Sequence, residues 1–232
     1  MVQNPYTAAR DLAETTHDRQ GRNRVWWENL PMTYVEWDRE DRLPQGPEDF
    51  AAVERAYLDL NPWIKEKFGF GAYRDRKMLT VGCGSGVEVC LFAKGGAVAT
   101  AIDITDQAVR LTEANARAQG LSIDVRRMDA EKMDFPNASF DYVYSWGVLH
   151  HSQAPDAAFL EVARVLRPGG SGLLMVYHRH SLRYYGKGLY WLLAKGKLFR
   201  GHTLDSVQGY FTDGYYFYSG RKRCRLTLPS LS

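Results

Sequence analysis

Cysteine is scarce in this chain, and long apolar runs are missing from it. Only three cysteines occur in the 232 residues, at Cys83, Cys90 and Cys224, and their spacing matches no zinc-binding pattern. So few thiols, odd in number, indicate a cytoplasmic protein with reduced cysteines rather than a disulfide framework. No stretch reaches the roughly 20 apolar residues of a membrane span. The polar, acidic start MVQNPYTAARDLAETTHDRQ also lacks the apolar centre of a secretory signal peptide.

The composition is that of a globular protein. Apolar residues make up 45% of the chain and charged residues 25%, which argues against a disordered or collagen-like protein. The length allows one well-buried domain with a modest appendage, and is too short for two full-sized enzymatic domains. Residues 178–232 hold ten lysines and arginines against two aspartates. Without a nucleic-acid-reading motif, this basic end favours a solvated tail over contact with DNA, RNA or an anionic membrane.

Sequence patterns divide the chain into an N-terminal helical and aromatic segment (1–75), a core (76–177) and a C-terminal substrate-side segment with the basic tail (178–232). In the core, strand and helix signals alternate, which predicts an α/β fold with a parallel sheet. Strands are expected at 76–82, 97–103, 122–129, 139–146 and 171–178, and helices at 87–93, 105–119 and 155–166. The last strand is apolar enough for burial on both faces. The Pro-Gly-Gly at 168–170 is expected to end the helix before it.

The flanking segments are rich in aromatic residues. One helix is predicted from Pro47 to the Asn61-Pro62 pair. Its inner face is expected to carry Phe50, Val53, Tyr57 and Leu60. A second amphipathic helix is expected within 182–193, with no convincing sixth or seventh strand after it. Aromatic side chains in the flanking segments either form a lid and an acceptor pocket or pack onto the sheet. They are Tyr6, Trp26, Trp27, Tyr34, Trp37, Tyr184, Tyr185, Tyr215 and Tyr216.

A glycine turn after the first strand carries the strongest signal. Gly82, Gly84 and Gly86 follow the strand directly and precede a helix. Glycines at such a turn let the backbone bend tightly and let a ligand approach the amide groups. An ordinary strand–helix turn is the competing interpretation. The spacing is G-x-G-x-G and not the G-x-G-x-x-G of dinucleotide-binding proteins, which argues against a bound pyrophosphate.

Acidic residues follow the second and third strands. Asp103 ends the second strand, where its carboxylate can accept both hydroxyls of a ribose, and helix capping is the alternative role. Asp129 follows the third strand. Because the carboxyl ends of parallel strands share one edge of the sheet, we expect the glycine turn and both carboxylates to meet in one crevice.

Four segments in order, MLTVGCGSG, AID, MDAEKMDFPNASFDYVYSWGVLHH and RVLRPGG, resemble the motifs of class I S-adenosylmethionine-dependent methyltransferases of the bacterial small-molecule type. The resemblance covers roughly residues 76–177 and implies a Rossmann-like sheet of seven strands with S-adenosyl-L-methionine as cofactor. It also implies the cofactor contacts. Gly82, Gly84 and Gly86 would cradle the methionine part, Asp103 and Ile104 would lie at the ribose, Asp129 and Ala130 at the adenine, and Ser145 with the backbone near Trp146 beneath the methionine.

The chain departs from that family in two places. Thr80 stands two residues before the first glycine, where the family usually has an acidic residue, and a hydroxyl offers no charge to the cofactor's ammonium group. The last two strands of the family sheet also have no counterpart in the Arg-rich end. This end is either an altered terminus, leaving the C-terminal strands incomplete, or a sheet edge that another chain completes, as in a homodimer.

Histidines supply the candidate catalytic groups. Methyl transfer needs proximity, alignment and exclusion of water, and no metal or covalent nucleophile. A general base helps when the acceptor must lose a proton. The candidates are His151, beside His150 after the fourth strand, and His178 and His180 after the fifth. The alternative for His150 and His151 is structural packing or a cofactor contact, and for His178 and His180 it is capping of the strand end or contact with the segment that follows. No metal site is expected.

The resemblance implies methyl transfer to a small organic metabolite by in-line displacement. Residues 145–148 read Ser-Trp-Gly-Val in place of the Asn/Asp-Pro-Pro-aromatic element of nucleic-acid amino-methyltransferases, and no cysteine follows a proline as in cytosine C5 enzymes. The competing hypotheses are a cofactor-binding protein without turnover, a nicotinamide oxidoreductase and an RNA-binding methyltransferase. These residues leave the acceptor atom open between O, N and C.

Overall fold

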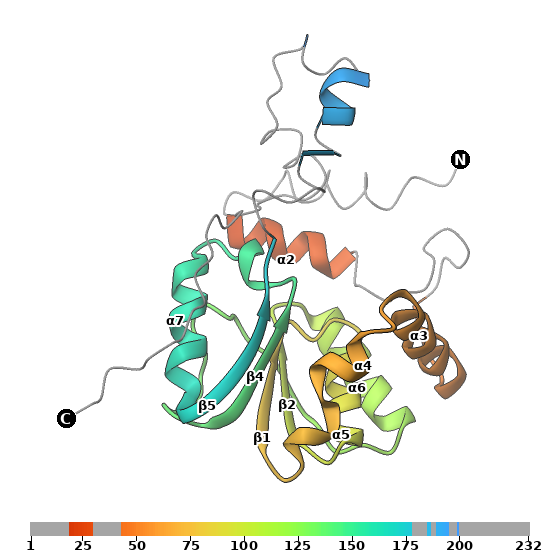
Figure 1. The fold of residues 1–232 in the computed structure, drawn as a ribbon, viewed down its shortest axis with the longest axis vertical. Coiled ribbons are helices and arrows are strands. Elements are labelled where there is room, and N and C mark those ends of the chain that lie inside the picture. Colours follow the sequence, from red (N-terminus) through yellow and green to blue (C-terminus); the bar gives the residue numbers. More distant parts are fainter. Residues whose placement is uncertain (1–18, 30–42, 178–184, 187–188, 195–198, 200–232) are drawn as a thin grey trace, which may run out of the picture.

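The computed structural model of the protein describes residues 19–29, 43–177, 185–186, 189–194 and 199. At its centre lies a parallel sheet in the order β3-β2-β1-β4-β5. The strands are β1 (Lys77–Val81), β2 (Val98–Asp103), β3 (Asp124–Arg127), β4 (Phe140–Trp146) and β5 (Leu166–Met175). Helices flank the sheet on both faces (Figure 1). This Rossmann-like arrangement confirms the predicted fold class, and the strand order reverses between β1 and β4, where such sheets form their ligand crevice.

The helices begin and end at residues with clear local causes. Thr105 caps α6, because its hydroxyl oxygen accepts a hydrogen bond from the Ala108 amide at 3.2 Å. Prolines occupy the first turns of α3 and α7, where a missing amide hydrogen costs nothing. The helices are α2 (Arg19–Asn29), α3 (Pro47–Leu60), α4 (Ile64–Phe68), α5 (Val87–Lys94), α6 (Asp106–Ala118) and α7 (Pro155–Val165). Shorter turns are η1 (Phe70–Tyr73), η2 (Leu149–His151) and η3 (Tyr190–Ala194).

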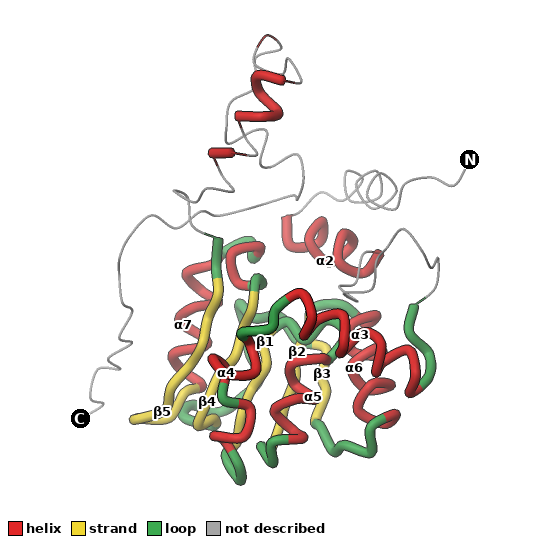
Figure 2. The backbone as a smooth tube through the Cα atoms, turned by 45° about the vertical axis from the view of Figure 1, so that its right-hand side comes forward, coloured by secondary structure: helices red, strands yellow, loops and turns green. Residues whose placement is uncertain are grey.

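Two apolar clusters hold the helices against the two faces of the sheet. On one face, side chains of α3, α4 and α5, such as Tyr57, Phe68 and Phe92, pack against Met78 of β1 and Tyr144 of β4. On the other face, α7 packs in one cluster with residues of β1, β2 and β4, such as Leu79, Ile102 and Val143. Full burial of one such large side chain stabilises the fold by about 1.5–3 kcal/mol. Figure 2 shows the sheet between these two groups of helices.

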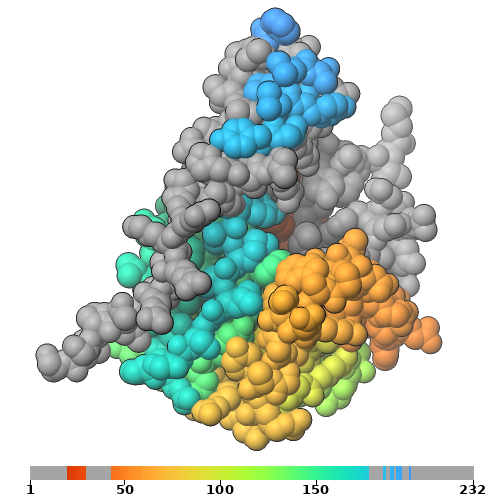
Figure 3. All heavy atoms as spheres, in the orientation of Figure 1, coloured from red at the N-terminus to blue at the C-terminus, as the bar shows by residue number. Residues whose placement is uncertain are grey.

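Aromatic packing joins the α4 segment to the end of β4. The Trp146 ring lies 5.1 Å from the Phe68 ring and 5.7 Å from the Trp63 ring, measured between centroids. In the space-filling view, the orange surface of α3 and α4 adjoins the teal surface of β5 (Figure 3). This contact fixes the residues that follow β4, which lie at the carboxyl edge of the sheet.

The fifth strand differs from its prediction. It begins at Leu166, directly after α7, and includes the Pro-Gly-Gly that was expected to separate helix from strand. A register shift takes up the extra residues: Phe140 pairs with Leu166, whereas Tyr142 pairs with Ser171. The prediction of burial on both faces is wrong, since only Leu166 of this strand is buried. A second difference concerns α3: Leu60 was predicted to lie on its inner face, but this residue is 69% exposed.

Helix α2 has no counterpart in the predicted pattern and lies across the carboxyl ends of the strands (Figure 1). None of the described helices is long and apolar enough to cross a membrane. Several predictions fall outside the described residues, namely those on Tyr6, Tyr34, Trp37, His178, His180, Tyr184, Tyr215 and Tyr216. The same holds for residues 182–184 and 187–188 of the helix predicted within 182–193, whereas its end lies in η3.

Candidate cofactor site

A cavity lies at the carboxyl ends of the strands and beneath α2. Its floor is the glycine turn, and its sides are the segments that follow β2, β3 and β4. Three side chains of α2 complete the lining, namely Gln20, Asn23 and Trp27. The glycine turn, Asp103 and Asp129 therefore meet in one crevice, as the strand order requires.

The glycine turn has the backbone geometry that makes glycine necessary. Gly82, Gly84 and Gly86 have φ angles of 78°, 55° and 80°, a region that other residues rarely adopt. A Cβ atom on Gly82 would lie 2.3 Å from Cγ2 of Val148. Gly82 and Gly84 line the cavity, whereas Gly86 caps α5 and packs against Thr112.

Helix α6 supports the turn from behind. The Thr112 hydroxyl donates to the Gly84 carbonyl oxygen at 3.3 Å, and the Asn115 side-chain amide donates to the Ser85 carbonyl oxygen at 2.9 Å. Both side chains are buried. Sequence reasoning missed these two residues, although two polar side chains one turn apart on the inner face of a helix are a usable signal.

Asp103 links the glycine turn to the start of α6. Its carboxylate accepts hydrogen bonds from the Gly84 amide at 3.2 Å and from the amide and hydroxyl of Thr105 at 3.0 and 2.9 Å. Burial raises the pKa of Asp103 above its ordinary value of 3.8, and these hydrogen bonds oppose the rise. Ile104 follows and also lines the cavity. Asp103 thus does not cap α6 itself, but it holds the Thr105 cap in place at the edge of the cavity.

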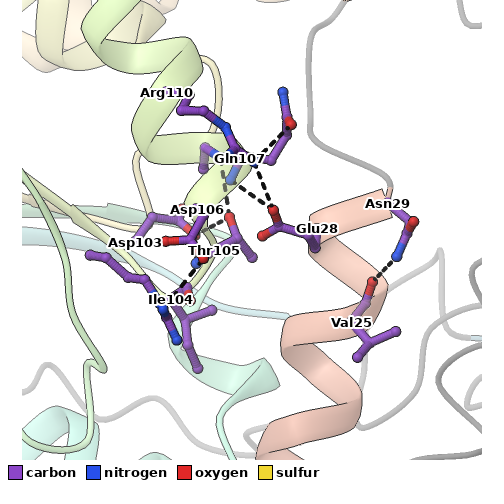
Figure 4. A network of polar contacts seen from close by, with 11 residues as sticks. Val25, Glu28, Asn29, Asp103, Ile104, Thr105, Asp106, Gln107 and Arg110 are labelled. Carbon is purple, nitrogen blue, oxygen red and sulfur yellow. Dashed lines mark hydrogen bonds and ion pairs between the residues drawn. The ribbon is translucent and has the colours of Figure 1, made fainter.

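Helix α2 is docked by polar contacts. The Glu28 carboxylate accepts a hydrogen bond from the backbone N–H of Gln107 at 3.1 Å and forms an ion pair with Arg110 at 3.3 Å. Both residues belong to α6 (Figure 4). Near the middle of α2, the Asn23 side-chain amide donates to the His151 carbonyl oxygen. These contacts hold α2 over the cavity from both sides.

Gln20 contacts the acidic residue that follows β3. Its side-chain amide nitrogen donates to both carboxylate oxygens of Asp129, at 2.9 and 3.0 Å. Gln20 also exchanges two hydrogen bonds with Gln153, each 3.1 Å long. Ala130 lines the cavity beside Asp129. Asp129 is thus directed toward amino-group donors at this end of the cavity.

The two neighbouring histidines have different positions. His151 lines the cavity, and its ring makes an edge contact with Trp27 at 5.2 Å between centroids. His150 is fully buried against the rings of His151 and Tyr177, and burial lowers its pKa to about 4. Of the pair, only His151 is placed to meet a ligand.

Cys83 and the predicted residues Ser145 and Trp146 differ in how they lie relative to the cavity. Cys83 lines the cavity, but burial and then the Asp103 carboxylate raise the pKa of its thiol well above the ordinary 9.0, which leaves it a poor nucleophile. Ser145 is not among the residues that line the cavity, and its hydroxyl donates to the Val81 carbonyl oxygen at 3.0 Å. Its neighbours Tyr144 and Trp146 line the cavity instead.

The charge of the lining is one-sided. Three carboxyl side chains face the cavity, those of Glu88, Asp103 and Asp129, and the described lining residues include no lysine or arginine. Across the described chain, no group of three or more His, Cys, Asp or Glu side chains is arranged to hold a metal ion. The three carboxylates can accept hydrogen bonds from hydroxyl and amino groups of a ligand, and they can attract a cationic group.

The fold and this site define a class of protein: a Rossmann-like α/β domain with its ligand crevice at the glycine turn. Residues 79–174 match the family described as "Methyltransferase domain". This segment runs from β1 to the end of β5 and contains the glycine turn and both strand-end carboxylates.

Curated relatives include ubiquinone biosynthesis O-methyltransferases. The one from Pseudomonas aeruginosa strain LESB58 is 28% identical over 154 residues, covering 64% of this chain and 60% of that protein. The one from Parvibaculum lavamentivorans is 31% identical over 144 residues, covering 56% and 57%. The chain thus spans about three fifths of the length of these relatives. A methyltransferase structure from Methanosarcina mazei is 29% identical with a TM-score of 0.46, covering 53% of this chain and 63% of that one.

Residues 79–174 are therefore similar to a methyltransferase domain, and the cofactor that the sequence resemblance implies is S-adenosylmethionine. The residues present fit this cofactor. The turn at Gly82 leaves no room for a Cβ atom, and the cavity joins carboxylates to apolar walls such as Val81 and Ile102. The sulfonium and ammonium groups of the cofactor would find opposite charges there.

Proposed function

We propose that the protein transfers a methyl group from S-adenosylmethionine to a small organic acceptor. The observation that carries this proposal is the cavity lining, with a glycine turn and three carboxyl side chains but no lysine or arginine among its described residues. A dinucleotide would bring two phosphate charges into this acidic cavity, so the lining disfavours a nicotinamide cofactor. When bound, S-adenosylmethionine supplies a methyl group activated by a positively charged sulfur.

The protein's own residues would bind, orient and exclude water. Asp103 would accept the ribose hydroxyls, and Asp129 would accept the adenine amino group in the position where it now accepts from Gln20. Trp27 of α2 would cover the cavity, and Tyr144 and Trp146 would form its wall on the β4 side. Such alignment of two bound reactants can supply about 7–11 kcal/mol of the barrier.

A hydroxyl acceptor would need to lose a proton. The curated relatives are named O-methyltransferases, which favours an oxygen acceptor. His151 is the described histidine that lines the cavity and is the candidate general base. His178 and His180 remain proposed bases from the segment after β5.

The test is methyl transfer from isotopically labelled S-adenosylmethionine into pools of bacterial hydroxylated metabolites, with products identified by mass spectrometry. We expect S-adenosylhomocysteine to form together with an acceptor that gains one methyl group. Binding of S-adenosylmethionine without transfer to any pool would favour a cofactor-binding protein without turnover. Binding of NAD in place of S-adenosylmethionine would overturn the proposal.

A further inference from the structure

A second hollow lies at the amino ends of the strands, on the side of the sheet opposite α2 (Figure 1). The loops that precede β1 and β4 and the first residues of β5 form it. Its charged lining residues are four basic and two acidic ones, namely Arg74, Asp75, Arg76, Lys77, Asp141 and Arg167. Residues 43–177 as a whole hold 17 carboxyl side chains against 14 lysines and arginines. This basic hollow is therefore a positive site on an acidic domain.

One of its two carboxylates is already neutralised. Asp141 has a side chain that is 12% exposed, forms an ion pair with Arg167, and accepts a hydrogen bond from the Lys77 backbone N–H at 2.8 Å. The other three basic side chains of the basic hollow form no ion pair within the described part of the chain. They share the basic hollow with one further carboxylate, Asp75, so a net charge of +2 remains there.

The backbone around the basic hollow has an uncommon conformation. A tight turn places Asp75 between Arg74 and Arg76, and the Arg76 N–H closes the turn with a hydrogen bond of 3.0 Å. Asp75 and Ala138 have φ angles of 59° and 54°, and apart from glycines no other described residue has a positive φ. Backbone of this kind gathers at functional sites. The Arg74 side chain lies across Gly96, where a Cβ atom would be 2.9 Å from Nη1 of Arg74.

We propose that the basic hollow binds the phosphate group of a small molecule, a function beyond the methyl transfer proposed above. A phosphate group carries up to two negative charges, which would balance the net charge of the basic hollow. An arginine guanidinium matches phosphate oxygens with two parallel hydrogen bonds. Asp75 and Asp141 would repel the repeated charges of a nucleic acid. A single phosphate group therefore fits this site better than a polymer does.

Calorimetry with inorganic phosphate, on the full chain at constant ionic strength, tests the site. Arg74→Gln combined with Arg76→Gln should lower the affinity for phosphate at least about tenfold. The matched control combines Arg55→Gln and Arg117→Gln, which remove the same charge from exposed arginines of α3 and α6 outside the basic hollow. This control should bind phosphate as the wild type does.

Asp75→Asn tests the site in the opposite direction. Asparagine tolerates a positive φ, so this variant keeps the turn and removes a charge that repels phosphate. We expect its affinity for phosphate to rise by about two- to fivefold. A weaker affinity would overturn the charge balance on which the proposal rests.

The other outcomes are equally decisive. The proposal is overturned if the wild type binds no phosphate, if the Arg74 and Arg76 double variant binds it as well as the wild type, or if the control loses as much affinity. Much tighter binding of a single-stranded oligonucleotide, lost in that double variant, would make the basic hollow a nucleic-acid contact instead. All of these proteins should bind S-adenosylhomocysteine equally, so the cofactor site is measured separately.

Discussion

At the scale of single residues, Asp103 serves the fold and the proposed ligand with the same carboxylate. Burial raises its pKa above 3.8, and an ionised carboxylate accepts hydroxyl donors more strongly than a protonated one. We therefore expect affinity for S-adenosylhomocysteine to fall as pH is lowered through this raised pKa. The effect on stability has the opposite sign: the folded state takes up the proton first, so protonation of Asp103 adds to the free energy of unfolding.

Calorimetry at a series of acidic pH values, on wild type and Asp103→Asn, measures this prediction. The variant should bind more weakly at neutral pH, by about tenfold, and its affinity should depend less on pH. An identical pH profile in both proteins would show that another group titrates, for example on the ligand.

Gly82 offers a test of the glycine turn with a matched control. A Cβ atom at Gly82 would meet Val148 at 2.3 Å, whereas one at Gly120 would meet nothing within 4 Å, and both glycines have positive φ angles. Gly82→Ala should therefore lower the free energy of unfolding by about 1–3 kcal/mol more than Gly120→Ala, and it should weaken ligand binding. Chemical denaturation gives the difference, and equal losses would mean that Val148 yields without cost.

The sequence can indicate a site residue when the order of the strands places that residue at the cavity, and it cannot when a long-range contact does so. Asp103 and Asp129 follow strands, so the order of strands alone brings them together. Gln20 contacts Asp129 across 109 residues of chain, and no local pattern announces such a contact. Successive side chains of β4 lie on opposite faces of the sheet. Tyr144 and Trp146 therefore line the cavity, whereas Ser145 between them is buried and bonded to Val81.

At the scale of elements, α2 covers the cavity, and its Gln20 side chain donates hydrogen bonds to Asp129, the carboxylate proposed to bind adenine. Because the Gln20 amide and an adenine amino group would need the same oxygens of Asp129, the two compete. Gln20→Ala should therefore raise the affinity for 5′-methylthioadenosine, by up to about tenfold. Gln107→Ala is the control, since the Gln107 side chain lies outside the cavity. Weaker binding by Gln20→Ala would instead make Gln20 a direct support for the ligand.

Elements with their own local signals were predicted well, and those held by tertiary contacts were not. Thr105 and the apolar period of α6 define that helix from sequence alone. Helix α2 reads RQGRNRVWWEN, where adjacent tryptophans among polar residues give no clear period, and its position depends on the contacts of Glu28 and Asn23. The start of β5 was missed because its Pro-Gly-Gly is accommodated by a register shift against β4.

At the scale of the whole molecule, the buried His150 ties stability to pH. Its pKa is lowered to about 4, whereas an unfolded histidine titrates near 6.5. Between these values the unfolded chain binds the extra proton, so the free energy of unfolding should fall as pH falls, by on the order of 3 kcal/mol. Denaturation of wild type and His150→Phe at pH values across this range measures the effect. The variant should lose this part of the pH dependence, and an unchanged slope would assign it to other groups.

The one-sided charge of the cavity bears on how a catalytic cycle ends. In the proposed reaction, loss of the methyl group turns a sulfonium into a neutral thioether, so the spent cofactor carries one positive charge fewer. Glu88, Asp103 and Asp129 stand without a lysine or arginine among the described lining residues, and they attract the fresh cofactor more strongly than the spent one. The same carboxylates that favour loading would therefore hasten product release and limit inhibition by accumulated S-adenosylhomocysteine.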